Sequence, residues 1–133
     1  MSDELEDLTG PVPGARTHEL SRMLRERESR NVTFLSPEFP VFWESANGAT
    51  VTDVDGNRYL DFASAFGVAN VGHSNPRVAS AIAEQSKRLM HGMGDVHPTE
   101  ARAKLLERLP SILPKGLNKT FLATTGAEAV ERH

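Results

Sequence analysis

Apolar positions first recur at helical spacing within residues 17–30. Leu20, Met23 and Leu24 form a short apolar stripe, and arginines and glutamates occupy most of the other positions. This pattern predicts an amphipathic helix that packs on a surface, and a partner-binding helix is the alternative. Residues 1–16 are acidic at the start and rich in glycine and proline afterwards, so we expect a flexible tail there.

The pattern then changes to short runs separated by turn signals. The dipeptides Asn47-Gly48 and Asp55-Gly56 favour the positive φ angles of tight hairpin turns. We therefore expect an antiparallel meander of three short strands. The candidate strands are residues 41–45, 49–54 and 58–62.

Helical spacing returns after the meander. Residues 72–76 (GHSNP) offer a capping side chain and a proline suited to a first helical turn, and apolar residues follow at helical intervals up to Leu89. Gly92 is expected to end this helix in a left-handed conformation. A second amphipathic helix is expected from about Pro98 to Pro110.

The last residues combine a short apolar run with the opening of a helix. Residues 119–124 (KTFLAT) predict a buried strand, and residues 125–131 (TGAEAVE) predict a helix directly after it. A strand followed by a helix is the first half of a βαβ unit, which needs a returning strand to bury its faces. We therefore expect the N-terminal portion of a longer protein.

Composition and charge narrow the class of protein. The chain has 133 residues, of which 38% are hydrophobic and 25% are charged, as in one compact soluble domain. A net charge of −3 without a basic arm argues against a nucleic-acid partner. The absence of cysteine excludes disulfides and thiolate chemistry. The acidic N-terminus is unlike a targeting peptide, and we expect a cytoplasmic protein without membrane contact.

The junction between Thr124 and Glu128 is the strongest candidate for chemistry. The first amides of a helix lack intrahelical acceptors and lie at the positive end of its dipole, so they can hold a phosphate. Gly126 admits a ligand to the backbone, Ala127 adds a second N–H, and Thr125 offers a hydroxyl. The alternative is a capping box between Thr125 and Glu128. A Glu128 carboxylate folded onto the cap would repel a dianion, so bound phosphate requires Glu128 to point elsewhere.

Other polar groups are weaker candidates. His91, Asp95 and His97 lie among glycines that interrupt any regular face, and we expect no metal site. The three aspartates within residues 53–61 are better explained as turn and strand-end residues than as a catalytic carboxylate pair.

Three ordered motifs resemble the N-terminal third of the class III aminotransferases. They are residues 48–62 (GATVTDVDGNRYLDF) after Trp43-Glu44, residues 72–76 (GHSNP) and residues 125–131 (TGAEAVE). The resemblance implies dependence on pyridoxal 5'-phosphate and an α/β protein, the N-terminal part of a type I transferase fold. In that fold a small antiparallel meander and helices precede the first strand and helix of the large-domain sheet. It also implies a homodimer with active sites at the subunit interface.

The resemblance also assigns residues to a site. Thr125, Gly126 and Ala127 match the turn that receives the cofactor phosphate. Phe66 matches a position where an aromatic residue lines the substrate entrance. Its alternative is membership of a local aromatic cluster, because seven of the eight aromatic residues lie within residues 34–66.

No catalytic residue is expected within the chain itself. The resemblance places the family's Schiff-base lysine downstream of the phosphate turn, and the lysines present match no catalytic motif. His73 is expected to stabilise its turn rather than to act as an acid or base. The implied division is a flexible tail (1–16), a small-domain part with linker helices (17–116) and the truncated start of the large cofactor-binding domain (117–133).

The implied reaction moves an amino group from a small-molecule donor to a 2-oxo acid acceptor such as 2-oxoglutarate. An ω-amino donor such as ornithine, acetylornithine or 4-aminobutyrate is favoured. The 133 residues alone are expected to be inactive. Pyridoxal-phosphate aminomutases, racemases and decarboxylases of the same fold remain alternatives, as does a non-catalytic truncated or interaction module.

Overall fold

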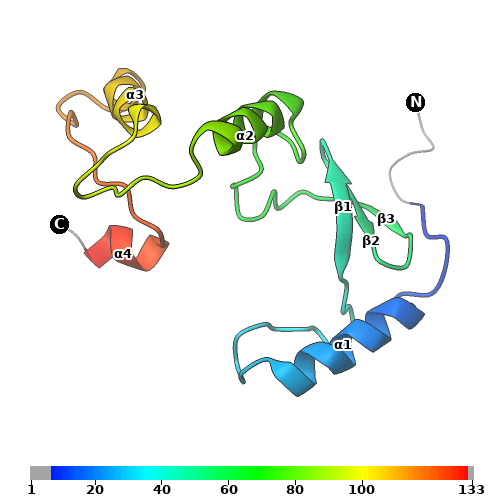
Figure 1. Cartoon of the computed structure of the whole chain (residues 1–133). Coiled ribbons are helices and arrows are strands. Elements are labelled where there is room, and N and C mark those ends of the chain that lie inside the picture. Colours follow the sequence, from blue (N-terminus) through cyan, green and yellow to red (C-terminus); the bar gives the residue numbers. More distant parts are fainter. Residues whose placement is uncertain (1–6, 132–133) are drawn as a thin grey trace. The chain divides into compact units, whose positions relative to one another are not determined.

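The computed structural model describes residues 7–131 (Figure 1). The chain separates into two compact units, Met1–Glu84 and Gln85–His133. The predicted domain boundaries after residues 16 and 116 stay predictions. In chain order the elements are α1 (Ala15–Arg27), β1 (Trp43–Asn47), β2 (Thr50–Asp53), β3 (Arg58–Leu60), α2 (Pro76–Arg88), α3 (Glu100–Arg108), the 3-10 turn η1 (Leu109–Ser111) and α4 (Gly126–Glu131).

The predicted antiparallel meander is confirmed. Its strand order is β1-β2-β3, with Asn47 paired to Thr50 in the first ladder and Thr50 paired to Leu60 in the second. Gly48 and Ala49 therefore form the first loop, and Asn47 remains in the strand. The φ angle of Gly48 is 58°, whereas Asn47 has no positive φ, so this turn is not the expected one with positive φ at both dipeptide positions.

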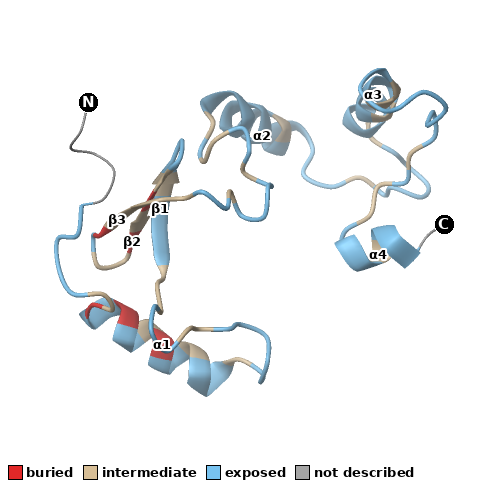
Figure 2. Ribbon diagram, turned by 180° about the vertical axis from the view of Figure 1, so that it is seen from behind, coloured by how far each residue is buried: buried red, intermediate tan, exposed pale blue. Residues whose placement is uncertain are grey.

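The core of the first unit lies at β2 and the turn that follows it (Figure 2). Among residues 7–131, Val51 is the only hydrophobic residue that is buried. Beside it in the chain, Asp53 and Asn57 are 2% and 0% exposed. Because buried polar groups need hydrogen-bond partners, this part of the fold depends on a polar network as much as on apolar packing.

Helix α1 confirms the predicted helix but buries a different face. Its buried residues are Thr17 and Ser21, whereas Met23 of the expected apolar stripe is 49% exposed. Its N-terminal cap comes from the turn between β2 and β3. The Asp55 carboxylate accepts hydrogen bonds from the N–H groups of Arg16 (2.8 Å) and Thr17 (3.0 Å). These hydrogen bonds fix the start of α1 against the sheet.

The described part of the expected tail is attached to the meander. Asp7 and Arg58 form an antiparallel bridge with N···O distances of 2.9 and 3.4 Å. The N–H of Gly10 donates to Asn57 Oδ1 at 3.1 Å. The expectation of a flexible tail is therefore wrong for these residues, because backbone pairing holds them without any apolar pattern in their sequence. The first six residues of the predicted tail lie outside the described part of the chain.

Both predicted amphipathic helices after the meander are present. The Asn75 side chain accepts from the N–H two residues later (3.0 Å) at the start of α2, and Thr99 accepts from the N–H three residues later (3.2 Å) at the start of α3. Helix α2 ends at Arg88. Gly92 has no positive φ, so its expected role as a left-handed helix end is wrong. No helix within residues 7–131 combines the length and apolar character of a membrane span.

The strand predicted over residues 119–124 is not formed. The three strands of the described chain pair with one another, and none pairs with this segment. Phe121 is 48% exposed rather than buried. A strand is stabilised by a ladder of hydrogen bonds to a neighbouring strand, and β1, β2 and β3 form no such ladder with this segment. The helix expected after it does form, as α4.

Candidate functional site

The first turn of α4 leaves two neighbouring backbone donors unused. The N–H groups of Gly126 and Ala127 have no acceptor among residues 7–131, as is typical of the start of a helix. A Cβ built on Gly126 would meet nothing within 4 Å. Two adjacent donors beside open space are suited to an anion such as phosphate.

A capping box is also present at this turn, in a shifted form. Thr125 Oγ1 accepts from the N–H of Glu128 at 3.1 Å. The Glu128 carboxylate accepts from the N–H (3.0 Å) and the hydroxyl (2.8 Å) of Thr124, not from the N–H of Thr125. The hydrogen bonds from Thr124, the backbone one first, lower the pKa of Glu128. The cap therefore occupies the amides of Thr124 and Glu128 and leaves those of Gly126 and Ala127 free.

Phe66 does not belong to an aromatic cluster. Its side chain is fully exposed, and Phe62 is 92% exposed. The ring contacts of this unit join Phe39 with Tyr59 and Trp43 with His73, each edge-to-face with centroids 5.7 Å apart, and neither includes Phe66. Phe66 lies in the first compact unit and residues 125–127 lie in the second. Among residues 7–131 Phe66 therefore lies outside any aromatic cluster, and its place at the substrate entrance stays a prediction.

A carboxylate–imidazole pair that sequence reasoning missed ties the ends of the segment that carries Phe66. Asp61 Oδ2 lies 2.6 Å from His73 Nε2, and Asp61 Oδ1 accepts from the N–H groups of Ala63 and Ser64, both at 2.9 Å. The hydrogen bond with His73 is the largest cause that lowers the pKa of Asp61. The backbone of His73 pairs with Gly48 in both directions, at 2.8 and 3.0 Å. His73 thus stabilises a turn, as the motif predicts.

A second carboxylate, Asp53, organises the turn between β2 and β3. It accepts from the N–H groups of Asp55 and Asn57, from Asn57 Nδ2 and from the Tyr59 hydroxyl, at 2.8–3.1 Å. Burial acts to raise the pKa of Asp53, but these hydrogen bonds outweigh it and the pKa is lowered. Burial, followed by the contact with Asp53, raises the pKa of Tyr59 to about 12. The aspartates of this region are turn and strand-end residues, as predicted.

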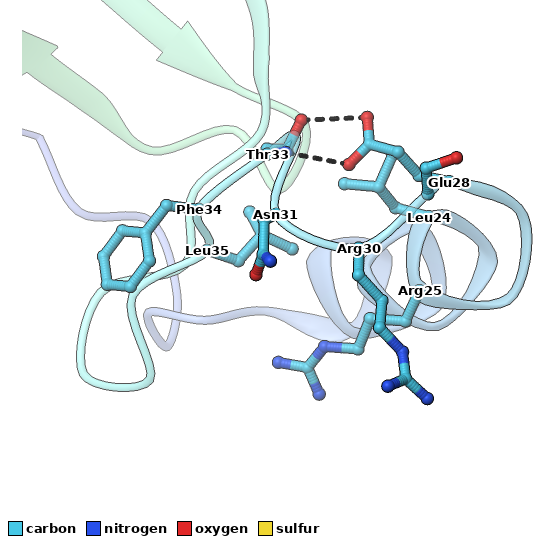
Figure 3. Close-up of a pocket in the computed structure, with 9 residues that line it drawn as sticks. Leu24, Arg25, Glu28, Arg30, Asn31, Thr33, Phe34 and Leu35 are labelled. Atoms are coloured by element: carbon cyan, nitrogen blue, oxygen red, sulfur yellow. Dashed lines mark hydrogen bonds between the residues drawn. The ribbon is translucent and has the colours of Figure 1, made fainter.

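A hollow of about 340 Å³ lies beside the end of α1 (Figure 3). Arg25 and Arg30 contribute to its lining, and the Glu28 carboxylate accepts from the N–H and hydroxyl of Thr33, both at 3.0 Å. None of the residues that the motifs predict for the site lines this hollow. Within residues 7–131, no group of three or more His, Asp or Glu side chains could hold a metal ion.

Comparison of the sequence with known proteins gives a consistent result. The profile of the family described as "Aminotransferase class-III" matches residues 34–133. A [LysW]-aminoadipate semialdehyde transaminase of Deinococcus radiodurans is 44% identical over 84 residues, which are 63% of this chain and 19% of that protein. A 4-aminobutyrate aminotransferase of Mycobacterium leprae is 34% identical over 130 residues, which are 97% of this chain and 28% of that protein.

Comparison of the structure agrees with the sequence. The crystal structure of acetylornithine aminotransferase from Elizabethkingia anophelis superposes with a TM-score of 0.73 at 29% sequence identity, covering 86% of this chain and 27% of that chain. This chain therefore spans from 19% to 28% of the lengths of these three proteins.

Proposed function

The chain belongs to the class III aminotransferase family, and we propose that the protein containing it transfers an amino group from an ω-amino acid or amine to a 2-oxo acid such as 2-oxoglutarate. The family and the type I fold expected from the motifs are confirmed, and enzymes of this class depend on pyridoxal 5'-phosphate. The names of the relatives support the donor class, since 4-aminobutyrate and acetylornithine are both substrates named among them.

The turn at Thr125, Gly126 and Ala127 has the donors that a cofactor phosphate needs. Two free N–H groups point from the first turn of α4, the space beside Gly126 is open, and the Thr125 hydroxyl adds a third donor. We therefore assign the phosphate of pyridoxal 5'-phosphate to these three residues. When bound, this cofactor supplies an electron sink and the carbonyl carbon that carries nitrogen from donor to acceptor.

Glu128 sets an electrostatic condition on this binding. Its carboxylate is held on Thr124 within the same turn as the free amides of Gly126 and Ala127. A glutamate carboxylate is ionised at neutral pH, and its negative charge repels a phosphate bound at the neighbouring amides. We expect Glu128 to leave Thr124 when phosphate binds, which would free the Thr124 N–H as a further donor.

The remaining parts of the proposal concern the substrate and the assembly. Phe66 lines the substrate entrance, because its ring is free of any core contact and can meet the carbon chain of a donor. The 133 residues alone are inactive, since the lysine that carries the cofactor in this family has no counterpart at a matching motif here. We propose that the active protein is a cytoplasmic homodimer, in keeping with its family resemblance.

The free amides of Gly126 and Ala127 beside open space carry this proposal, and a substitution that fills the space tests it. Gly126 has no positive φ, so Gly126→Val adds bulk without backbone strain. The variant is made in the protein that contains this chain. We expect it to lose the visible absorbance of the cofactor. We also expect it to transfer amino groups from 4-aminobutyrate or acetylornithine to 2-oxoglutarate at least about tenfold more slowly.

Gly10→Val is the matched control, because a Cβ at Gly10 also meets nothing within 4 Å. This control should bind cofactor and transfer amino groups as the unaltered protein does. Normal cofactor binding by Gly126→Val would contradict the assignment of the phosphate. If the unaltered protein binds the cofactor but transfers no amino group, that result would contradict the proposed reaction.

A further inference from the structure

The segment that carries Phe66 contains a run of left-handed backbone. Ser64, Ala65 and Phe66 have φ angles of 48°, 48° and 57°, and Gly67 follows with 89°. Residues other than glycine adopt this region rarely, and then usually singly, because Cβ approaches the following carbonyl oxygen. Such strain persists where the surrounding structure imposes it, and it is concentrated at functional sites.

Both ends of this segment are attached to the same loop of the meander. The N–H of Asp61 donates to the carbonyl of Ala49 at 2.9 Å, and His73 pairs with the backbone of Gly48. Residues 61–73 therefore form a loop whose ends lie side by side, the arrangement of an Ω-loop. The ring of Trp43 also meets the His73 ring edge-on, with centroids 5.7 Å apart.

Apolar packing does not hold the left-handed turn, because Phe62 and Phe66 are both exposed. One carboxylate connects its start to the far end of the loop. Asp61 Oδ1 accepts from the N–H groups of Ala63 and Ser64, where the turn begins, while Oδ2 binds the His73 imidazole. The Asp61 side chain is 5% exposed, so water competes little for these charge-assisted hydrogen bonds.

We infer that Asp61 and His73 are positioning residues, which hold the left-handed turn of residues 64–67 and thereby fix Phe66 at the substrate entrance. The role of Phe66 in this inference rests on the proposed function. The pairing of Asp61 with His73 is argued from the geometry of the loop alone and does not depend on the proposed function. Neither side chain touches substrate in this scheme, and both act through the placement of Phe66.

Proteolysis of the naturally expressed protein tests whether the pair holds the loop. A protease needs an extended chain, so cleavage after Phe66 by chymotrypsin reports opening of the turn. We expect Asp61→Ala to raise the rate of this cleavage by about tenfold. Asp95→Asn and His91→Gln, at exposed positions outside the loop, should leave the rate unchanged. An unchanged rate in Asp61→Ala would overturn the inference.

Kinetics test whether the pair acts through Phe66. Asp61→Ala should raise the KM for the amino donor by about tenfold, with kcat and cofactor absorbance unchanged. Phe66→Ala should do the same, and the double variant should be no worse than the poorer single variant, because coupled residues are not additive. Additive effects, or loss of cofactor in Asp61→Ala, would show a general structural role and overturn the inference.

The two tests separate this inference from the proposed function. Cleavage requires neither cofactor nor substrate, so a negative result there removes the positioning pair and leaves the aminotransferase proposal intact. Faster cleavage in a protein that transfers no amino group would contradict the proposed function and the role of Phe66. If Asp61→Ala does not fold, His73→Gln keeps the hydrogen bonds to Ala63 and Ser64 and allows the same measurements.

Discussion

The turn after β2 and the turn before α4 use their hydrogen-bonding groups in opposite ways. In the first turn, Asp53 accepts four hydrogen bonds and the side chain of Asn57 is completely buried. In the second, the N–H groups of Gly126 and Ala127 remain free beside open space. The first turn maintains the shape of the meander, whereas the second has donors available for another molecule.

The carboxylates of the two turns show the same contrast. The pKa values of Asp53 and Glu128 are both lowered by hydrogen bonds. Asp53 is 2% exposed, so loss of its partners would leave buried polar groups unsatisfied. The hydrogen bonds of Glu128 are exposed to solvent, so water or a ligand can replace them at little cost. The same chemical group is therefore structural in one turn and exchangeable in the other.

Of the substitutions that test this contrast, Asp53→Ala should have the largest effect, which is a loss of stability. The substitution leaves the Asn57 side chain and the Tyr59 hydroxyl without their acceptor, and we expect the free energy of unfolding to fall by about 3 kcal/mol. Urea denaturation followed by circular dichroism measures the change. Asp95→Asn serves as the exposed control and should stay within about 0.5 kcal/mol of the unaltered protein. A loss below about 1 kcal/mol in Asp53→Ala would contradict the structural role of this turn.

Asp55→Ala should have a smaller effect, confined to the attachment of α1. The Asp55 carboxylate caps this helix from the far side of the turn, and loss of a cap costs about 1 kcal/mol. Amide hydrogen exchange in the first turn of α1 should become correspondingly faster. The two bonds go to different carboxylate oxygens, and asparagine keeps one acceptor oxygen, so Asp55→Asn should show an intermediate rate of exchange. A rate in Asp55→Ala equal to that of the unaltered protein would show that Asp55 does not cap α1.

Glu128→Gln should tighten anion binding at the second turn. The variant removes one negative charge near the free amides of Gly126 and Ala127, and we expect the Kd for pyridoxal 5'-phosphate to fall by about threefold. Equilibrium titration of the unloaded protein measures this change. Glu131→Gln, in the same helix but without a hydrogen bond to Thr124 among the described residues, is the control. Weaker binding by Glu128→Gln would show that the carboxylate assists the phosphate site.

The smallest expected effect is a change in the pH dependence of stability. The pKa of Asp55 is lowered in the folded protein, with the hydrogen bond from the Thr17 side chain as the largest cause. Its contribution to stability is therefore present above the unfolded pKa and is lost as pH falls through the folded pKa. Asp55→Asn should flatten the acid side of a plot of unfolding free energy against pH. An identical slope in Asp55→Asn and the unaltered protein would show that the pKa of Asp55 is the same in the folded and unfolded states.

Local patterns predicted much of this fold. The glycine-containing turns and short apolar runs identified the three strands. The capping residues within 72–76 and the helical spacing of apolar residues identified α2 and α3, whereas the Thr99 cap of α3 was not predicted. These features depend on residues close together in the sequence. The cap of α1 by Asp55 and the pairing of Asp7 with Arg58 join residues far apart, and neither produces periodicity that sequence analysis can detect.

The site was predictable to a similar degree. The start of a helix at Gly126 and the cap between Thr125 and Glu128 follow from local spacing. The shift of the Glu128 carboxylate to Thr124 depends on side-chain geometry, which the capping pattern does not specify. The pairing of Asp61 with His73 was missed because each residue had a sufficient local explanation, one as a strand-end acid and the other as a turn residue.

Nuclear magnetic resonance of the backbone amides during titration with pyridoxal 5'-phosphate tests the central claim most directly. We predict that the N–H signals of Gly126 and Ala127 shift as the cofactor is added, while that of Asn57 in the turn after β2 stays in place. Cofactor binding with unchanged signals from Gly126 and Ala127 would contradict the claim that these two amides hold its phosphate.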